Sequence, residues 1–306
     1  DPPDSAAASP ENSSEPTETS DRKLPVTYHR SDAVPEEATI STPFLGASVL
    51  QAEDQIPLDE VIAFLDRQAM FAGQWQMRKA KNQSREDYEQ DLADKAEPIL
   101  QTWLARAKDE KLLLPAVAYG YFPCGRDGNA VAVFNPEGGA ALGRFDVPRQ
   151  RSGNRYCIAD FFRDLKEGQP CDVLPMQAVT MGEEASRFSQ ELFRKDAYSD
   201  YLFFHGLAVQ MAEALAEWTH ARIRRECGFS DPEAMPLRDI FAQRYRGSRY
   251  SFGYPACPNV ADSRQQLEWL QADRIGLTMD ESDQLHPEQS TTALVALHSN
   301  ARYFSA

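Results

Sequence analysis

The chain has 306 residues, 42% of them hydrophobic, which is enough to bury a core in one large domain or two ordinary ones. With 32 basic and 47 acidic residues its net charge is −15, which argues against nucleic acid or an anionic membrane as a partner. An acidic surface suits a basic protein partner, although solubility alone is the better explanation. We find neither a signal-peptide pattern nor an apolar run of roughly 18 residues, and we expect a soluble, cytoplasmic protein.

The usual signatures of catalysis and of metal binding are absent from the sequence. The five cysteines are odd in number, scattered and never spaced as CxxC, so they suggest neither a disulfide framework nor a zinc site. The five histidines lack ligand spacing such as HExxH, and we find no glycine-rich phosphate loop and no GxSxG motif. The sequence therefore predicts no metal site and no catalytic nucleophile or base.

The first forty residues differ in composition from the rest. Residues 1–20 contain no basic and no large apolar side chain, so they cannot bury enough surface to offset the entropy of ordering. Residues 23–40 are a transition that we expect to be extended. We therefore predict an acidic linker, disordered or extended, over residues 1–40 and a folded domain over residues 41–306. Such a linker also suggests that another domain precedes it in a parent protein.

Two helices and then several strands are expected in the first part of the domain. Residues 56–65 form an apolar segment with Pro57 near the first turn of a helix, and residues 84–108 have an apolar stripe at helical spacing. The period then changes to that of strands at residues 116–122 and 130–134, which turn residues separate as in a hairpin. Residues 174–180 resemble a further strand.

A long helix is predicted over residues 198–227, with Gly228 as its stop signal. A loop over residues 249–258, a helix over residues 262–274 and a closing strand pair, residues 289–297 and 302–304, follow. Strands and helices do not alternate regularly. This favours an α+β domain with a mainly antiparallel sheet over a doubly wound nucleotide-binding fold.

The loop at residues 249–258 has a composition suited to ligand binding. Pro255 and Pro258 each remove a backbone donor and Gly253 favours unusual dihedral angles, so we expect neither helix nor strand to run through it. Backbone groups outside secondary structure can bind a ligand rich in hydrogen-bonding groups, such as an adenine edge, and Arg249 suits a carboxylate. On composition alone, a rigid turn beside the core remains the better explanation.

The same segment carries a family resemblance. Residues 245–249 (YRGSR) and 253–258 (GYPACP) resemble the C-terminal reactivation (activation) domain of cobalamin-dependent methionine synthase, which binds S-adenosylmethionine. Further segments resemble the family in the same order, and together they extend the similarity from about residue 42 to the C-terminus: residues 64–75, 156–161 (YCIADF), 212–220 and 302–304 (RYF). Six collinear residues rich in Pro, Gly, Tyr and Cys are hard to obtain by chance.

The resemblance implies a fold and a function. The fold would be a single α+β domain with a bent, mainly antiparallel sheet flanked by helices. The domain would present the methyl group of S-adenosylmethionine to cob(II)alamin, which one electron reduces, and so support methyl transfer from 5-methyltetrahydrofolate to homocysteine to make methionine. Reduced cobalt attacks the sulfonium methyl, so the protein supplies placement and matched charges and no base or nucleophile of its own.

The partners implied are those of the parent enzyme. The cobalamin-binding domain of the same enzyme would hold cobalamin, because this chain has no DxHxxG-type cobalamin motif. A flavodoxin or a flavoprotein reductase would donate the electron.

The resemblance also implies site residues. Arg249 would pair with the methionyl carboxylate, and Asp66 with the methionyl ammonium or the neighbourhood of the sulfonium. The backbone of Ser251, Gly253 and Tyr254 would bind the adenine. Two rival explanations remain open, namely that Asp66 is a solvated helix residue and that Arg249 forms only a surface ion pair.

Other residues are weaker candidates. Tyr303 and Phe304 would form the opposite wall of the site, or they pack the last strand. For Glu213 on the long helix, a contact with the ligand and a role without such a contact are equally supported. The loop at residues 286–290 resembles a segment near the donor site, where His286 would contact cobalamin or its domain, although a structural turn is favoured. Cys257, between two prolines, is better explained as a packed thiol.

The chain departs from the family at three places. Residues 250–252 read Tyr-Ser-Phe where other members carry smaller residues and proline, Gln210 stands where some members have arginine, and the chain ends soon after Phe304. These departures would alter affinity or partner choice but leave the core motif intact. Two alternative functions also stay open. One is a stand-alone donor or interaction protein that binds S-adenosylmethionine and serves another corrinoid enzyme, and the other is an interaction domain that has lost the ligand.

Overall fold

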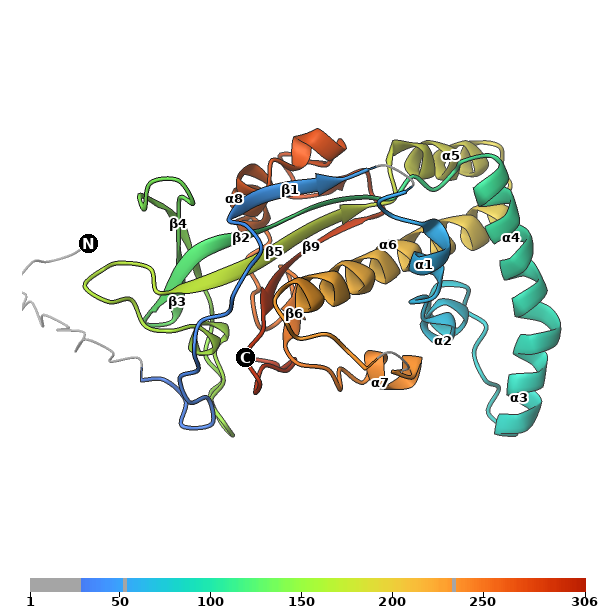
Figure 1. Cartoon of the computed structure of the whole chain (residues 1–306). Helices are drawn as coiled ribbons and strands as arrows, with labels where there is room; N and C mark the ends of the chain where they lie inside the picture. Colours follow the sequence, from blue (N-terminus) through green and yellow to red (C-terminus); the bar gives the residue numbers. More distant parts are fainter. Residues whose placement is uncertain (1–28, 52–53, 233–234) are drawn as a thin grey trace, which may run out of the picture.

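The computed structural model describes residues 29–51, 54–232 and 235–306. Its centre is a seven-stranded sheet, and every pairing between its strands is antiparallel (Figure 1). The strand order is β4-β3-β2-β5-β9-β6, with β1 also paired to β2. The strands are β1 (Gly46–Leu50), β2 (Ala116–Asp127), β3 (Ala130–Phe134), β4 (Ala141–Asp146), β5 (Asp172–Thr180), β6 (Ser248–Tyr250) and β9 (Ser290–Ala296).

The twelve-residue strand β2 organises the sheet. One of its edges pairs with β5 from Ala116 to Cys124, while its other edge pairs first with β1 and then with β3. Gly120 lies at the crowded point of the β1 pairing, where an added Cβ would come within 2.1 Å of the Gly46 carbonyl oxygen. A glycine is required there because any side chain would push β1 away from β2.

Each face of the sheet covers its own hydrophobic core, because successive side chains of a strand point to opposite sides. The face that we call the helical face contributes Val117, Tyr119, Tyr121, Val179 and Val295 to a core shared with the long helices. The opposite face contributes Ala118, Phe122, Met176, Ala178 and Leu294 to a second core.

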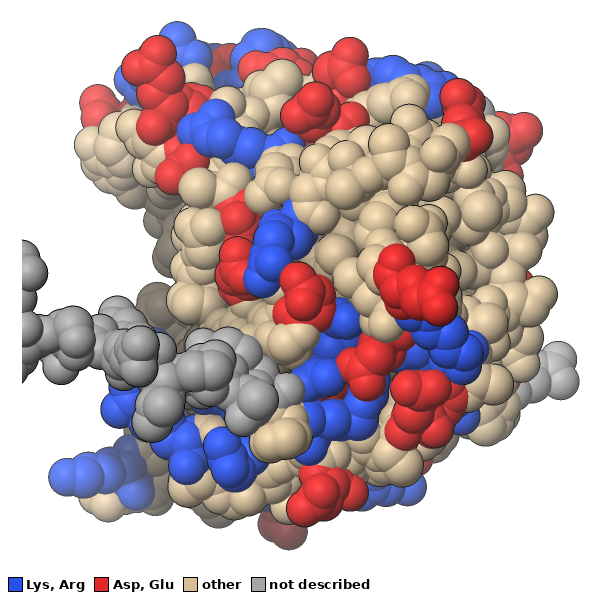
Figure 2. Space-filling view, turned by 90° about the vertical axis from the view of Figure 1, so that its left-hand side faces the viewer, with Lys and Arg blue, Asp and Glu red and all other residues tan. Residues whose placement is uncertain are grey.

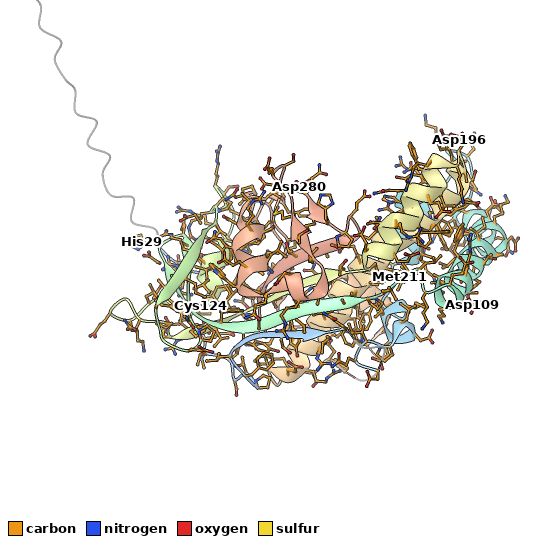
Figure 3. The ribbon with its side chains drawn as sticks, turned by 90° about the horizontal axis from the view of Figure 1, so that it is seen from above. His29, Asp109, Cys124, Asp196, Met211 and Asp280 are labelled. Carbon is orange, nitrogen blue, oxygen red and sulfur yellow. The ribbon has the colours of Figure 1, made fainter. Side chains whose placement is uncertain are left out.

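The helical face is covered by α6 (Tyr198–Glu226), which runs along the sheet, while α5 (Glu183–Arg194) and α4 (Glu97–Asp109) pack against α6 beyond the end of the strands (Figure 1). Seen from above, the helical end with Asp109 and Asp196 lies far from the end with His29 and Cys124 (Figure 3). The shorter helical elements here are α1 (Leu58–Ile62), α2 (Arg67–Ala69), η1 (Met70–Gln74), α3 (Arg85–Asp91) and η2 (Leu92–Ala96).

Shorter elements cover the opposite face. They are η3 (Ile158–Phe161), α8 (Asp262–Trp269) and η4 (Ala272–Ile275), and their apolar side chains complete the second core. A small hairpin of β7 (Thr278–Met279) and β8 (Leu285–His286) precedes β9, and α7 (Leu237–Phe241) precedes β6. Within the described helices, no segment combines the length and apolarity that a membrane crossing needs.

The predicted α+β class with an antiparallel sheet is confirmed. The long helix ends at Glu226, one residue before its predicted end, and the strand predicted over residues 174–180 is β5. The helix predicted over residues 84–108 is present as α3, η2 and α4, with a π-helical turn in the middle.

Three local predictions are corrected by tertiary structure. Strand β6 includes residues 249 and 250, the first two of the predicted loop, because β9 supplies pairing partners from a distant part of the chain. Residues 302–304 form no strand. The helix predicted over residues 262–274 ends at Trp269, and Gln271 then adopts a left-handed conformation with φ of 52°. Strands β1 and β4 and helix α5 were not predicted.

Part of the segment predicted as a linker packs against the domain. Val34 is fully buried in the second core, and the amide of Ser31 donates to Asp160 over 3.1 Å. The guanidinium of Arg30 donates to the carbonyl of Phe162 over 2.7 Å. Residues 29–40 therefore lie along the body of the domain, whereas residues 1–28 lie outside the described residues.

Candidate functional site

The motif at residues 249–258 begins on the edge strand β6. Its ladder with β9 runs from the pair Ser248–Ala296 to the pair Tyr250–Leu294. Arg249 lies opposite Val295, on the helical face, whereas Tyr250 points to the opposite face and stacks on Phe161 with ring centroids 6.1 Å apart. The alternation of the strand thus directs the guanidinium of Arg249 towards α6.

Arg249 is held by one acid and keeps donors to spare. Its Nη1 donates to Oε2 of Glu217 on α6, and 19% of its side chain is exposed. Among the described residues, no group accepts a hydrogen bond from Nε or Nη2 of Arg249. A guanidinium binds carboxylates through paired nitrogens, so this side chain can accept a second carboxylate.

A buried polar cluster lies behind Arg249, formed by Glu217, His220, Arg224, Asp231 and Tyr245. The hydroxyl of Tyr245 donates to Oε2 of Glu217 over 3.2 Å. Nη1 of Arg224 lies 3.8 Å from Oε1 of Glu217, and Nε of Arg224 donates to Asp231 over 3.0 Å. Arg224 is fully buried and its guanidinium carbon lies 3.7 Å from the centre of the Tyr245 ring. The contacts with Tyr245 and Arg224 hold the carboxylate of Glu217 in place.

His220 of the same cluster is fully buried, and within the described residues neither of its ring nitrogens has a hydrogen-bond partner. Burial, assisted by the charges of Arg224 and Arg249, holds the pKa of His220 well below its ordinary value. The imidazole is therefore neutral and packs edge-on against the ring of Tyr245, with centroids 5.2 Å apart.

The turn after β6 is closed by hydrogen bonds within its own backbone. The amide of Gly253, whose φ is 89°, donates to the carbonyl of Cys257 over 3.0 Å, and the amide of Cys257 donates to the carbonyl of Tyr254 over 2.9 Å. The Sγ of Cys257 lies 3.0 Å from the Ser251 carbonyl oxygen, and burial raises the pKa of this thiol to about 12. Within the described chain, no hydrogen bond involves the Gly253 carbonyl or the Tyr254 amide. These two groups remain available to a ligand.

A hollow of about 330 Å³ opens beside this turn, where β9 continues past the end of β6. This volume lies in the usual range of small-molecule sites. Arg249 does not line the hollow. Its walls come from the turn, the start of α8, the β7–β8 hairpin and the first half of β9 with the segment just before it: Ser251, Phe252, Tyr254, Val260, Ser263, Met279, Asp283, Gln284, Leu285, Glu288, Ser290, Thr291 and Thr292. The hollow thus joins the predicted loop to Glu288 and Ser290 of the segment 286–290.

The other predicted residues have varied positions. Asp66 caps α2, since its Oδ1 accepts a hydrogen bond from the amide of Ala69 over 2.9 Å. Glu213 is exposed on α6, one turn before Glu217. Its negative charge favours the charged form of Arg249. Tyr303 is 45% exposed, whereas Phe304 is only 6% exposed. Phe304 packs in the second core against the rings of Tyr156, Phe161 and Tyr250.

The structure therefore places Arg249 on the helical face, where it pairs with Glu217, and Ser251 and Tyr254 beside the hollow. Within the described residues, no hydrogen bond or ion pair links Asp66 to the loop. Sequence reasoning missed Glu217 as the partner of Arg249. The available signal was an acid and a base seven residues apart on the long helix, Glu217 and Arg224, which is two helical turns and therefore the same face.

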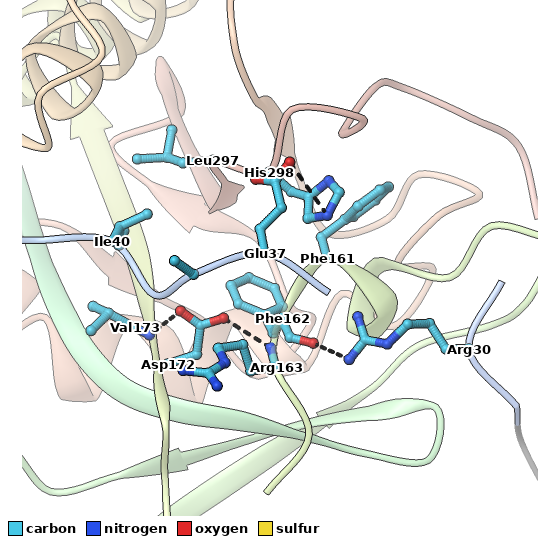
Figure 4. A pocket seen from close by; sticks show the side chains of 11 residues that line it. Arg30, Glu37, Ile40, Phe161, Phe162, Arg163, Asp172, Val173, Leu297 and His298 are labelled. Atoms are coloured by element: carbon cyan, nitrogen blue, oxygen red, sulfur yellow. Dashed lines mark hydrogen bonds and ion pairs between the residues drawn. The ribbon is translucent and has the colours of Figure 1, made fainter. Parts of the chain in front are cut away.

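Other hollows lie at the end of the sheet nearest residue 29. One is lined by Arg30, Arg149, Arg151 and Arg155 among others and has a volume of about 810 Å³. Basic and acidic side chains intermingle on this face (Figure 2). A second cavity, between the segment at residues 30–40 and Phe161, Asp172 and His298, measures only about 20 Å³, enough for about one water (Figure 4). Within the described ranges, no three His, Cys, Asp or Glu side chains gather as a metal site.

The arrangement of the helices and strands is that of a known class of protein. It matches the crystal structure of the MetH reactivation domain bound to AdoHcy with a TM-score of 0.75, over 88% of this chain and 83% of that chain, at 22% sequence identity. The chain thus has the fold of a methionine synthase reactivation domain.

Residues 57–306 match the family model described as the activation domain of vitamin B12 dependent methionine synthase. The chain belongs to this family, which confirms the resemblance seen in the sequence. It is 40% identical over 288 residues to the methionine synthase of Mycobacterium tuberculosis and 43% identical over 277 residues to that of Mycobacterium leprae. These alignments cover 90% and 86% of this chain but 24% and 23% of the relatives, so the chain spans about a quarter of their length.

Proposed function

We propose that this chain is the reactivation module of a cobalamin-dependent methionine synthase. It binds S-adenosylmethionine and places the methyl group for reductive methylation of cob(II)alamin, which the cobalamin-binding domain of the same enzyme holds. This supports methyl transfer from 5-methyltetrahydrofolate to homocysteine. The family membership and the AdoHcy bound to the structural relative support the proposal.

The residues present fit the chemical groups of S-adenosylmethionine. Arg249 is suited to the methionyl carboxylate, and Glu213, an exposed acid one turn before Glu217 on α6, is suited to the ammonium. The Tyr254 amide is available to donate to a ring nitrogen of the adenine, whereas the Gly253 carbonyl belongs to the same trans peptide and points the opposite way. When bound, S-adenosylmethionine supplies the methyl group and leaves as S-adenosylhomocysteine. The chain's own residues bind and orient it, which accounts for a site without a base or nucleophile.

Partners and location belong to the same proposal. A flavodoxin or a flavoprotein reductase supplies the electron. The module works in the cytoplasm, and its cysteines agree with a reducing compartment. All five, Cys124, Cys157, Cys171, Cys227 and Cys257, are free thiols.

The observation that carries the proposal is Arg249, a half-buried guanidinium bound by Glu217 through one nitrogen with others unused. Calorimetric titration with S-adenosylmethionine tests it. We expect measurable binding that Arg249→Ala weakens at least about tenfold, because a charged hydrogen-bonded pair is lost. Arg151→Ala is the control, since this exposed arginine lines a different hollow. Absence of heat with the unmodified chain would contradict the proposal.

A further inference from the structure

We propose that Glu217 is a positioning residue of this site. From α6 it holds Arg249 in the orientation that presents the unused guanidinium nitrogens to the carboxylate of the ligand. The inference rests on the proposed function and names the residue on which recognition of the amino-acid end depends.

Arg249 needs such a partner because of its place in the sheet. It lies on the three-residue edge strand β6, which pairs with β9 on one side only. A long side chain at an edge samples many rotamers unless a contact fixes it, and fixing them on binding costs free energy. Glu217 supplies that contact before any ligand arrives, through its hydrogen bond with Nη1 of Arg249.

Glu217 is itself rigidly supported. Its side chain is 9% exposed, accepts from the hydroxyl of Tyr245 over 3.2 Å and faces Nη1 of Arg224 at 3.8 Å. Arg224 is in turn bound by Asp231. A chain of alternating charges therefore runs from Asp231 through Arg224 and Glu217 to Arg249, and both of its ends are partly exposed.

The cluster is not arranged for stability alone. Both ring nitrogens of His220 are buried without a hydrogen-bond partner in the described residues, and Oε1 of Glu217 and Nη1 of Arg224 face each other only as an ion pair at 3.8 Å, without a hydrogen bond. Buried groups left unsatisfied cost free energy, so their retention calls for a role other than stability. A purely structural pair would also have no reason to leave Nε and Nη2 of Arg249 unused. Both features agree with a guanidinium held ready for a second carboxylate.

The test compares two ligands that differ by one carboxylate, S-adenosylmethionine and decarboxylated S-adenosylmethionine, by calorimetry on the 306-residue chain. Glu217→Gln keeps the shape of the side chain and removes its charge. We expect it to weaken binding of S-adenosylmethionine about tenfold and to change the affinity for the decarboxylated ligand less than about twofold.

The matched control is Glu226→Gln. Glu226 is a second acid of α6 that accepts from two tyrosine hydroxyls, Tyr119 over 3.1 Å and Tyr121 over 2.8 Å, and pairs with Arg222 at 2.8 Å. It makes no contact with Arg249 among the described residues. Both affinities should stay within about twofold of those of the unmodified chain.

Tyr245→Phe serves if Glu217→Gln does not fold, because it removes only one donor to Glu217. We expect a loss of about twofold to threefold, confined to S-adenosylmethionine. Equal weakening of both ligands by either variant would show a merely structural role, and tighter binding by Glu217→Gln would show that Glu217 occupies the place of the ligand. Either result overturns the inference while the proposed function stands. The function itself fails only if the unmodified chain does not bind.

Discussion

Arg149 binds the carboxylate of Asp160 with both terminal nitrogens, and its Nη2 lies 2.7 Å from Oδ1. Asp160 is fully buried and also accepts from Nε of Arg126 and from the amide of Ser31, each over 3.1 Å. One carboxylate thus ties strand β2, the segment after β4 and the N-terminal segment at residue 31 to η3. The family-like run at residues 156–161 therefore contains a structural anchor.

Asp160→Asn should destabilise the fold strongly, because it leaves two nearly buried arginines without their shared counter-charge. We expect the free energy of unfolding to fall by about 3–5 kcal/mol, measured by urea denaturation. The control is Asp164→Asn. Asp164 also pairs with Arg126, at 2.6 Å, but 52% of its side chain is exposed, so the loss should stay below about 1 kcal/mol. Equal losses of unfolding free energy in the two variants would show that burial does not determine how much each carboxylate stabilises the fold.

Gly253→Ala should weaken binding of S-adenosylmethionine about tenfold, because the turn must move for an L side chain. The φ of Gly253 is 89°, and an added Cβ would lie 3.1 Å from Cγ2 of Val260. Gly228→Ala is the control, since Gly228 has a φ of 82° with no atom near the added Cβ and ends α6 far from the loop in sequence. It should lower stability and leave the affinity unchanged, as calorimetry and thermal unfolding would report.

Tyr254→Ala should change the affinity for S-adenosylmethionine less than about threefold. The side chain of Tyr254 is 56% exposed, and the proposed adenine contact comes from its backbone amide. The substitution preserves that amide. A loss as large as that of Gly253→Ala would instead assign the adenine to the tyrosine ring, by stacking.

His220 should make stability depend on pH. Its folded pKa lies well below the 6.5 that applies in the unfolded chain, so below that pH the unfolded state binds more protons. The contribution of His220 is therefore fully favourable above pH 6.5 and is lost as the pH falls, by at most about 1.4 kcal/mol per pH unit. His220→Leu, of similar volume, should remove this dependence in urea titrations between about pH 7 and pH 5. An unchanged slope would mean that the imidazole titrates normally.

Sequence alone determined the elements whose pattern is local. The helical spacing of residues 198–227 and the strand-like runs at residues 116–122 and 174–180 need no knowledge of distant partners, and these elements are present as α6, β2 and β5. The prolines and Gly253 also indicated an irregular turn, which the structure has after residue 250. Together with the run GYPACP, these patterns were enough to predict the fold class and the family.

Only the tertiary structure decided which residues meet. Strand β6 exists because β9, more than forty residues later, offers a ladder, and Glu217 reaches Arg249 across 32 positions of sequence. Phe304, predicted as a wall of the site, lies in the second core because Tyr250 and Phe161 enclose it there. Periodicity records which face of an element is apolar, but pairings between distant segments depend on how the faces pack, and that information is not local.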